Sequence, residues 1–389
     1  MEFNKRAVAF AFVSFIALSA FGCKGPTGNS NNPQSATGAA PKPGKWVAQY
    51  RAPASLSYSA MDLAVFYYTG ISVVSLNVVF VCGDTPNAKG DERMGVIVRT
   101  TDGGQNWTDT PIDIPKMHIP TLNAIHFISP DVGWAVGVDS GEDGVVVKTT
   151  DGGSSWTATR ISQKQVPTAV FFVDADNGWM GAATPPPGED EGLGGPSALL
   201  TTTDGGLTWQ TRYNLPISIY RVFFFDKMNG WASGSKGVIY NTSDGGLTWN
   251  TQRTEIETGD GPQDLHGEGM KQFAVRGLQF IDEDNGFAAA TATEGVAGRL
   301  LVTSNGGVAW RRQWIVTNAG VRDIFFVSPN EGWALTEGPY VYHTVDGGRS
   351  WLSEPKVFEQ DVTLSRLGGV DAGHIWAVGA GAIFFRVSD

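Results

Sequence analysis

The chain has little cysteine, little histidine and little charge. Its 389 residues include 2 cysteines and 5 histidines, and 17% of them are charged. The histidines show no HExxH or other metal-binding spacing, so we expect neither a metal centre nor a cofactor. We interpret Cys23 and Cys82 separately rather than as a disulfide. Cys82 stands in an apolar run and reads as a buried small hydrophobe.

Basic residues are also scarce. The 28 lysines and arginines are outnumbered by 39 aspartates and glutamates, which gives a formal charge of −11. Nucleic acid binding requires a basic footprint, so nucleic acid is excluded as the main partner. With 41% apolar residues the chain is too hydrophobic for disorder, and its 50 glycines are typical of an all-β protein with many tight turns.

What the chain does contain is an eight-residue phrase that recurs six times. In the clearest copy, residues 242–249, the sequence Asp244-Gly245-Gly246 predicts a tight turn between two strands, and Trp249 opens the second strand. An Asp carboxylate accepts nearby backbone N–H groups, Gly tolerates positive φ, and Trp supplies a large buried ring. We therefore interpret the six copies as structural. Their third positions are Asp102, Asp151, Asp204, Asp244, Asn305 and Asp346.

The repeated phrase is identified as the Asp-box, or bacterial neuraminidase repeat. A second phrase, Gly-Trp or Gly-Phe followed by small residues, precedes five of the boxes, at residues 133–137, 178–180, 230–234, 286–288 and 332–334. Together the two phrases resemble the propellers of the photosystem II assembly and stability factor family. The resemblance covers residues 45–389 and implies a β-propeller with each box on the hairpin between a blade's two outer strands.

The number of blades follows from the start of the third strand of each repeat. Seven such starts occur, at Gly95, Gly144, Ser197, Gly237, Gly298, Pro339 and Gly381. The seventh copy reaches Val387 without an Asp-box, whereas residues 45–50 form a strand that has a Trp and no box before it. We therefore predict one all-β domain over residues 45–389. It is a seven-bladed β-propeller of four-stranded antiparallel blades, whose N-terminal strand closes the last blade and leaves no open edge.

The segment before the propeller predicts secretion and a lipid anchor. Residues 1–22 have a charged start and then, over 7–21, an apolar stretch that is short for a membrane span. Ala20-Phe21-Gly22-Cys23 resembles a bacterial lipobox, with Ala20 where Leu is more usual, and implies lipidation of Cys23. Simple secretion is the alternative. Residues 23–44, rich in Gly, Pro, Ser and Asn, predict a lipidated flexible tether. We expect a protein anchored at the outer membrane, facing the periplasm or the cell surface.

Insertions between the repeats indicate a functional face. In a four-stranded meander the connections between second and third strands, and those between blades, emerge where the inner strands begin. The insertions fall in these connections, at residues 52–66, 84–93, 139–143, 181–196, 255–271 and 291–297. Loops on a rigid scaffold commonly carry binding sites, so we predict that this insertion-rich face binds the partner.

Four arginines are predicted at the mouth of the central channel on this face. Counting back from the Gly-Trp phrases gives one residue at the start of each inner strand. In blades four to seven these are Arg221, Arg276, Arg322 and Arg366; in blades one to three they are Thr69, Asn123 and Thr168. Guanidinium groups pair with carboxylates or phosphates. The assembly factor family uses an arginine patch to recognise its protein client, so the resemblance implies a similar role here. Alternatively, each arginine pairs with a carboxylate on a neighbouring blade.

The sequence therefore predicts a non-catalytic, membrane-anchored platform that binds a protein or assembles a complex in the cell envelope. Two alternatives stay open: a purely structural envelope component, and a glycan-active propeller, either a sialidase-like glycoside hydrolase or a lectin. Glycoside hydrolysis usually requires two carboxyl groups about 5–10 Å apart, or a Tyr nucleophile. Glu268, Asp282 and Glu294 are acids that could reach the predicted face, but no pair stands out.

Overall fold

The structure is a computed structural model. It describes residues 44–51, 67–86, 92–112, 114–161, 164–184, 195–252, 254–255, 273–292, 298–314, 320–338, 340–354, 363–379 and 381–387. The predicted signal peptide, Cys23 and nearly all of the tether lie outside the described residues, as do the 52–66 insertion and parts of the other long insertions. Within the described ranges lie the strands β1 to β29 and one short 3-10 turn, η1 (Ser235–Gly237).

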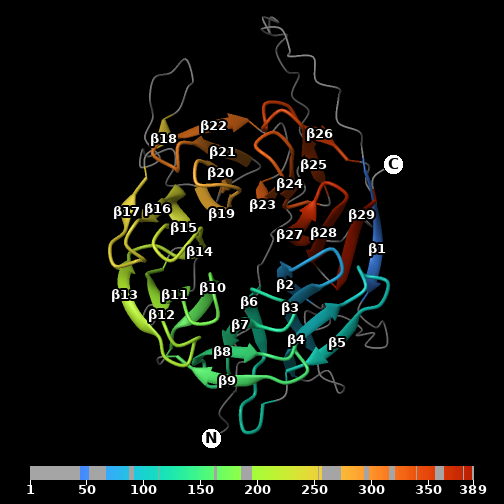
Figure 1. Cartoon of the computed structure of the whole chain (residues 1–389), viewed down its shortest axis with the longest axis vertical. Coiled ribbons are helices and arrows are strands. Elements are labelled where there is room, and N and C mark those ends of the chain that lie inside the picture. Colours follow the sequence, from blue (N-terminus) through green and yellow to red (C-terminus); the bar gives the residue numbers. More distant parts are fainter. Residues whose placement is uncertain are drawn as a thin grey trace, which may run out of the picture. The chain divides into compact units, whose positions relative to one another are not determined.

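The strands form seven sheets arranged in a ring, and the first strand of each repeat borders its centre, which we call the channel (Figure 1). Blade one contains β2 (Tyr67–Val73), β3 (Val79–Pro86), β4 (Arg93–Thr100) and β5 (Thr108–Pro111). Blade two contains β6 (Thr121–Phe127), β7 (Gly133–Val138), β8 (Gly144–Thr149) and β9 (Thr157–Arg160). Blade three contains β10 (Val166–Phe172), β11 (Gly178–Ala183), β12 (Ser197–Thr202) and β13 (Gln210–Leu215). Blade four contains β14 (Ile219–Phe224), β15 (Gly230–Gly234), β16 (Ile239–Thr242) and β17 (Asn250–Thr251).

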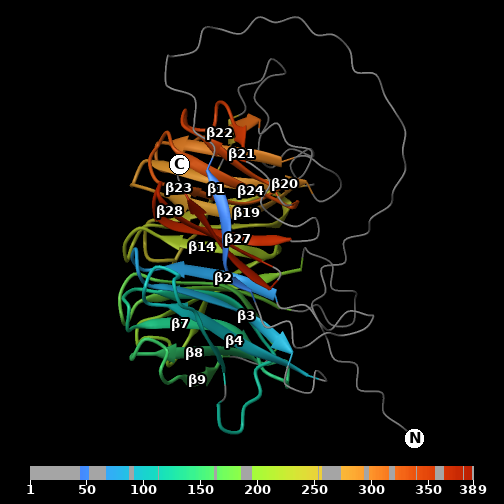
Figure 2. The ribbon, with the colours of Figure 1, turned by 90° about the vertical axis from the view of Figure 1, so that its right-hand side faces the viewer.

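The remaining three blades complete the ring. Blade five contains β18 (Thr254–Glu255), β19 (Phe273–Phe280), β20 (Asn285–Ala292), β21 (Gly298–Ser304) and β22 (Trp310–Trp314). Blade six contains β23 (Val321–Phe326), β24 (Gly332–Thr336), β25 (Val341–Thr344) and β26 (Leu352–Ser353). Blade seven contains β27 (Leu364–Asp371), β28 (His374–Gly379), β29 (Ala382–Val387) and β1 (Lys45–Arg51). Viewed from the side, the strands of successive blades run between the same two faces (Figure 2).

The predicted fold and its closure are confirmed. Strand β1 pairs antiparallel with β29, from Lys45 opposite Val387 to Arg51 opposite Ala382, so blade seven is built from both ends of the propeller. One detail differs from a four-stranded blade: β18 adds a fifth strand to blade five and runs parallel to β22. Residue 255 was predicted to lie in the connection between blades four and five, because two residues of edge pairing leave no periodic pattern.

The hydrophobic core lies between blades rather than within one blade. Seven apolar clusters occur, each made of residues from two neighbouring blades. The second strands, such as β7 and β11, are buried along almost their whole length, whereas the outermost strand β13 is largely exposed. This arrangement explains why the middle strands read as continuous apolar runs: both of their faces are covered by neighbouring blades.

A three-ring arrangement is repeated at most blade junctions. Phe172, at the end of β10, stacks on Trp134 of the preceding blade with ring centroids 3.6 Å apart, and Trp209 of its own Asp-box meets its edge at 5.8 Å. Trp134 also donates its indole N–H to the carbonyl of Gly205 in the next blade's box, at 2.9 Å. Equivalent triplets centre on Phe127, Phe224, Phe280 and Phe326.

Replacing the central ring of one triplet should therefore destabilise the propeller. We expect Phe172→Ala to lower the free energy of unfolding by about 3–5 kcal/mol, because it leaves a cavity between Trp134 and Trp209. The measurement is urea denaturation followed by tryptophan fluorescence. Leu207→Ala is the control: this side chain is 64% exposed, and its loss should change stability by about 0.5 kcal/mol or less. Equal losses in the two variants would contradict the proposed importance of the triplet.

Candidate functional site: the arginine cluster of the channel

Each inner strand contains a β-bulge near its start. In all seven blades the pairing of the inner strand with the second strand shifts by one residue there, and a bulge of this kind re-aims a side chain. The extra residues are Thr69, Asn123, Thr168, Tyr220, Arg276, Arg322 and Ser365.

The four arginines lie on the inner strands, but not at one level. Arg276 and Arg322 occupy the bulge position, whereas Arg221 and Arg366 come one residue later. The prediction that all four are the first residues of their strands was therefore wrong. Counting residues back from the Gly-Trp phrase does not show which residue the bulge leaves out of the pairing.

Arg221 is anchored across the ring. Its Nη2 lies 2.8 Å from Oδ1 of Asp323, which is two blades away, and its Nε donates to the carbonyl of Arg276 at 3.1 Å. The other carboxylate oxygen of Asp323 accepts the backbone N–H of Leu367 in blade seven, at 2.9 Å. The side chain of Asp323 is almost fully buried. This one carboxylate thus connects blades four, six and seven, a longer reach than the neighbouring-blade pairing considered from the sequence.

Arg366 is affected by the charges of all three other arginines. Burial, then the charge of Arg221, lower the pKa of Arg366 to about 9. Asp323 opposes this shift, and Arg322 and Arg276 add smaller lowering effects. Its Nη1 donates to the carbonyl of Ser365 at 2.9 Å, while its Nε is buried and donates no hydrogen bond. A buried guanidinium N–H without an acceptor is costly, so an anionic group at this position would be stabilised.

Arg276 and Arg322 complete the cluster. Arg276 lies over the ring of Tyr220, with its guanidinium carbon 5.1 Å from the centroid. Arg322 donates to the carbonyl of Leu364 at 3.3 Å. Burial, followed by the charge of Arg276, lowers the pKa of Arg322. We call Arg221, Arg276, Arg322 and Arg366 the arginine cluster.

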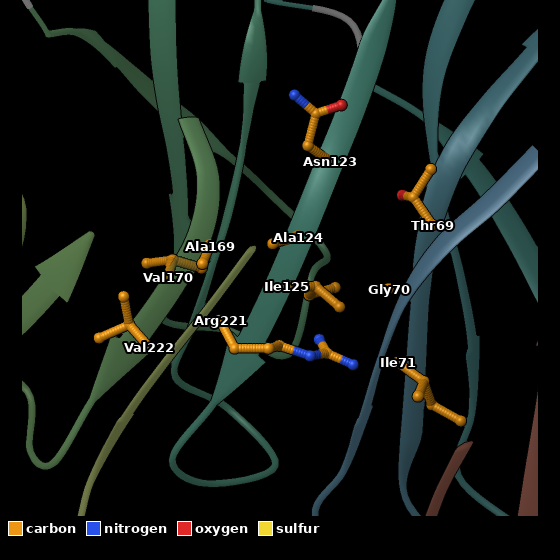
Figure 3. A pocket seen from close by; sticks show the side chains of 10 residues that line it. All are labelled: Thr69, Gly70, Ile71, Asn123, Ala124, Ile125, Ala169, Val170, Arg221 and Val222. Carbon is orange, nitrogen blue, oxygen red and sulfur yellow. The ribbon is translucent and has the colours of Figure 1, made fainter. Parts of the chain in front are cut away.

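Small or uncharged side chains line most of the opposite side of the channel. A cavity of about 50 Å³, lined by inner strands of blades one to four, includes Thr69, Asn123 and Arg221 (Figure 3). Figure 3 shows the Arg221 side chain extended into the space between the inner strands of blades one and two. A volume of this size holds a few water molecules.

Thr69, Asn123 and Thr168 hold neighbouring blades together. Their side chains donate to carbonyls of the next blade, those of Leu122, Pro167 and Ile219, at 2.6, 2.8 and 2.6 Å. Side chains of Ser233, Thr291 and Arg322 make corresponding bonds to the carbonyls of Val275, Val321 and Leu364. The accepting carbonyl always belongs to the residue just before a bulge, so the bulges form a belt of hydrogen bonds around the channel.

The Asp-boxes are self-contained turns. Oδ1 of Asp244 accepts Thr242 Oγ1 at 2.8 Å and the backbone N–H of Thr248 at 2.9 Å, and Oδ2 accepts Thr248 Oγ1 at 2.6 Å. Both glycines have positive φ, 73° at Gly245 and 89° at Gly246. Asp102, Asp151, Asp204 and Asp346 make the same set of bonds.

The fifth box keeps its geometry without a carboxylate. Oδ1 of Asn305 accepts Thr303 Oγ1 at 2.9 Å and the backbone N–H of Ala309 at 3.0 Å. Ala309 has no side-chain donor, so no second carboxylate oxygen is required. The exchanges at 305 and 309 therefore compensate each other.

Of the three acids considered for glycan chemistry, Asp282 is the one within the described residues, and it lies away from the predicted face. Asp282 lies in the turn between β19 and β20, at the end of the inner strand opposite the insertion-rich face, and accepts N–H groups of Asp284 and Asn285. The expectation that it could reach that face was wrong, because the turn chemistry fixes it elsewhere. Glu268 and Glu294 lie outside the described residues. Asp323 was missed: it sits next to Arg322, and only the assembled ring brings it to Arg221.

No grouping of three or more His, Cys, Asp or Glu in the described ranges could hold a metal ion. Nor does the described part of the chain contain a helix long and apolar enough to span a membrane. Cys82 is buried in the cluster between blades one and two, and burial raises the pKa of its thiol to about 12.

The hydrogen bonds of the Asp-box predict a measurable acid dependence. The side-chain and backbone bonds from Thr248 lower the pKa of Asp244 to about 2. A depressed carboxyl pKa stabilises the fold above the unfolded value of about 3.9, and this stabilisation is lost as pH falls through the folded value. We expect Asp244→Ala to cost about 1 kcal/mol at pH 7 and progressively less between pH 4 and pH 2.

The test is urea denaturation of the wild type and the variant over that pH range, with Asn305→Ala as the uncharged counterpart. The cost of Asn305→Ala should not change between pH 4 and pH 2. A constant cost for Asp244→Ala would show that the charge of the carboxylate is unimportant.

Comparisons with known proteins agree with this architecture. The family model of the photosystem II assembly factor YCF48 matches residues 74–184. A solved structure of YCF48 bound to a D1 peptide is 16% identical and has a TM-score of 0.61, covering 90% of this chain and 99% of that one. YCF48 from Cyanidioschyzon merolae is 18% identical with a TM-score of 0.58, over 88% of this chain and 98% of that one.

Other propellers are also similar in fold. The GH74 xyloglucanase from Xanthomonas campestris is 12% identical with a TM-score of 0.58, over 88% of this chain and 53% of that one. A search of curated proteins found no match. At these identities the solved structures establish the fold alone. The repeats, the matched family model and the ring together identify a seven-bladed Asp-box β-propeller that resembles the photosystem II assembly factor YCF48 family.

Proposed function

We propose that the protein is a non-catalytic assembly factor that binds a protein partner at the channel mouth of its insertion-rich face. The observation that carries the proposal is the arginine cluster: four blades each contribute one guanidinium to the same channel, although the chain as a whole is acidic. Structural pairing accounts directly for Arg221, which contacts Asp323. It does not account for the buried Nε of Arg366.

The chemistry favours a carboxylate as the group recognised. A guanidinium binds a carboxylate through parallel, charge-assisted hydrogen bonds, and partial burial strengthens the attraction. The neighbouring cavity has room for a few water molecules, so we expect the partner to present an acidic side chain or a terminal carboxylate at the mouth. A peptide ligand in the similar YCF48 structure supports a polypeptide as the partner.

The position of Asp323 supports binding over glycoside hydrolysis. Both of its oxygens are already bonded, one to Arg221 and one to the backbone of Leu367. A general acid or nucleophile must be available to the substrate. This carboxylate instead holds Arg221 in place.

Loss of charge in the arginine cluster should abolish partner capture. We expect the double variant Arg276→Gln, Arg322→Gln to recover at least tenfold less of its partner in a cross-linked pull-down from native envelopes. Capture by the wild type should also weaken as salt is raised. The matched control is Arg311→Gln, an exposed arginine on the outer strand β22.

Circular dichroism and thermal unfolding establish that each variant is folded. Retention of the same partner by the double variant would refute the role of the arginine cluster. Equal loss in the control would indicate a general charge effect instead.

We further propose that Cys23 carries a lipid that anchors the protein in the cell envelope, at the outer membrane. The lipobox-like Ala20-Phe21-Gly22-Cys23 and the tether composition support this. Cys23→Ser should abolish incorporation of labelled palmitate and move the protein from the membrane to the soluble fraction. Unchanged labelling and fractionation would contradict lipidation at this residue, and Cys82→Ser serves as the control.

A further inference from the structure

The junction between blades six and seven is sealed differently from the others. Three residues after the Trp that opens an outer strand, several blades carry a glutamine that reaches the next Asp-box. Gln49 donates to the carbonyl of Gly103 at 3.3 Å and accepts the indole N–H of Trp376 at 3.0 Å. Gln252 accepts the indole N–H of Trp310 at 2.8 Å. After Trp351, the same position is occupied by Glu354.

Blade seven has a matching exchange on the other side of this junction. In the third strand of blade four, Thr242 begins the Asp-box five residues after Gly237. In blade seven, Arg386 stands five residues after Gly381, in the position of that threonine. A glutamine and a threonine at other junctions are thus replaced here by a glutamate and an arginine.

These two exchanged residues form a buried ion pair. Oε1 of Glu354 lies 2.6 Å from Nε of Arg386, and the two side chains are 0% and 4% exposed. Oε1 also accepts the indole N–H of Trp333 at 3.2 Å, and Oε2 accepts the indole N–H of Trp46. Glu354 therefore connects blade six with both β29 and the closing strand β1.

The missing aromatic ring explains why space exists for this pair. Phe326 ends the inner strand of blade six opposite Gly332, whereas Gly369 holds that position in blade seven, opposite Ile375. No phenyl ring of β27 can stack on Trp333 from that position. Arg386 packs over the Trp333 ring instead, 5.0 Å from its centroid.

A histidine lies against the same ring and the same carboxylate. The ring of His343, on β25, stacks on Trp333 with centroids 4.4 Å apart. Its Nε2 lies 3.1 Å from Glu331 Oε1, and its buried Nδ1 lies 4.0 Å from Glu354 Oε1 without a hydrogen bond. The charged groups facing His343 are Glu331, Glu354 and Arg386.

We propose that Glu354, Arg386, Trp46 and His343 form a closing latch. In this latch the buried ion pair holds β1 in blade seven, and protonation of His343 releases β1 in acid. The pairing register of β1 and β29 is specified because Glu354 must accept hydrogen bonds from both Arg386 and Trp46. These two residues lie directly opposite each other in the β1–β29 ladder. A slip by one residue would turn Trp46 away from Glu354.

The direction of the pH effect follows from the surroundings of His343. Burial, then the charge of Arg386, lower the pKa of His343, against smaller opposing effects of Glu354 and Glu331. The unfolded histidine takes up a proton near pH 6.5, the closed form only at lower pH. Between these values the open form binds more protons, so closure loses stability as pH falls through this window.

Hydrogen exchange of the full-length protein at pH 7 tests the ion pair. We expect Glu354→Gln and Arg386→Thr each to raise exchange in β1 and β29 at least tenfold, because each leaves one buried charge without its partner. Exchange in β11, on the other side of the ring, should stay unchanged. The double variant restores the residue types found at other junctions. Its exchange rates in β1 and β29 should therefore be closer to those of the wild type than the rates of either single variant.

Asp139→Asn is the matched control, since it removes another buried carboxylate that is paired with an arginine, Arg160. Unchanged protection of β1 and β29 in both single variants would overturn the latch. So would equal loosening of every blade, or a double variant no better than the worse single one.

The pH dependence requires a second measurement. After correction for intrinsic exchange rates, β1 of the wild type should lose protection between pH 7 and pH 5, while β11 should not. His343→Phe keeps a ring against Trp333 but cannot take up a proton, and should abolish this difference. A flat wild-type profile, or the same profile in His343→Phe, would overturn the role of His343.

Discussion

The propeller depends on the contact between neighbouring blades, where a phenyl ring lies between two other aromatic rings. One ring comes from the preceding blade and stacks face to face. It is a Trp at three junctions, including that of Phe172, and a Phe at the junctions of Phe127 and Phe326. The other ring is the Trp of the blade's own Asp-box, which meets the edge of the central ring. Such pairs contribute about 0.5–1.5 kcal/mol each beyond the area they bury. Since the hydrophobic clusters all lie at junctions, no blade has a core of its own, and the ring must close for any blade to be buried on both sides.

This requirement gives the junction of blades six and seven particular weight. At three other junctions an indole N–H is satisfied by the carbonyl of an Asp-box glycine, as in Trp134 and Gly205. At this junction the Glu354 carboxylate accepts hydrogen bonds from Trp333, Trp46 and Arg386. A buried ion pair contributes little net stability compared with apolar packing. Removing one partner, however, strongly destabilises the fold, because the other charge stays buried without its partner. That asymmetry suits a contact whose role is to fix one pairing of two distant chain segments.

In the channel, neighbouring blades are joined by hydrogen bonds between polar side chains and carbonyls at the bulges. Bulges expose carbonyls to side chains of the preceding blade, and Thr69, Asn123 and Thr168 use them to join blades one to four. In blades four to seven the corresponding region carries arginines, which make some of these bonds and also concentrate positive charge. Burial, and then the charges of the neighbouring arginines, lower the pKa of Arg366. Asp323 holds Arg221 in place within the arginine cluster, and we propose the face where the insertions begin as the partner-binding face.

The sequence by itself determined the blade number, the turn geometry and the closure by residues 45–51. These features repeat with a regular period and depend on local chemistry, such as Asp244 and two positive-φ glycines in one turn. It also identified the four arginines that meet in the channel. Only the tertiary structure decided which arginines occupy a bulge and which lie one residue later. A one-residue bulge does not alter the number of residues between an arginine and the following Gly-Trp phrase. Likewise the tertiary structure alone joined Arg221 to Asp323 and Glu354 to Arg386, since these contacts arise where blades distant in sequence converge and no periodic pattern records them.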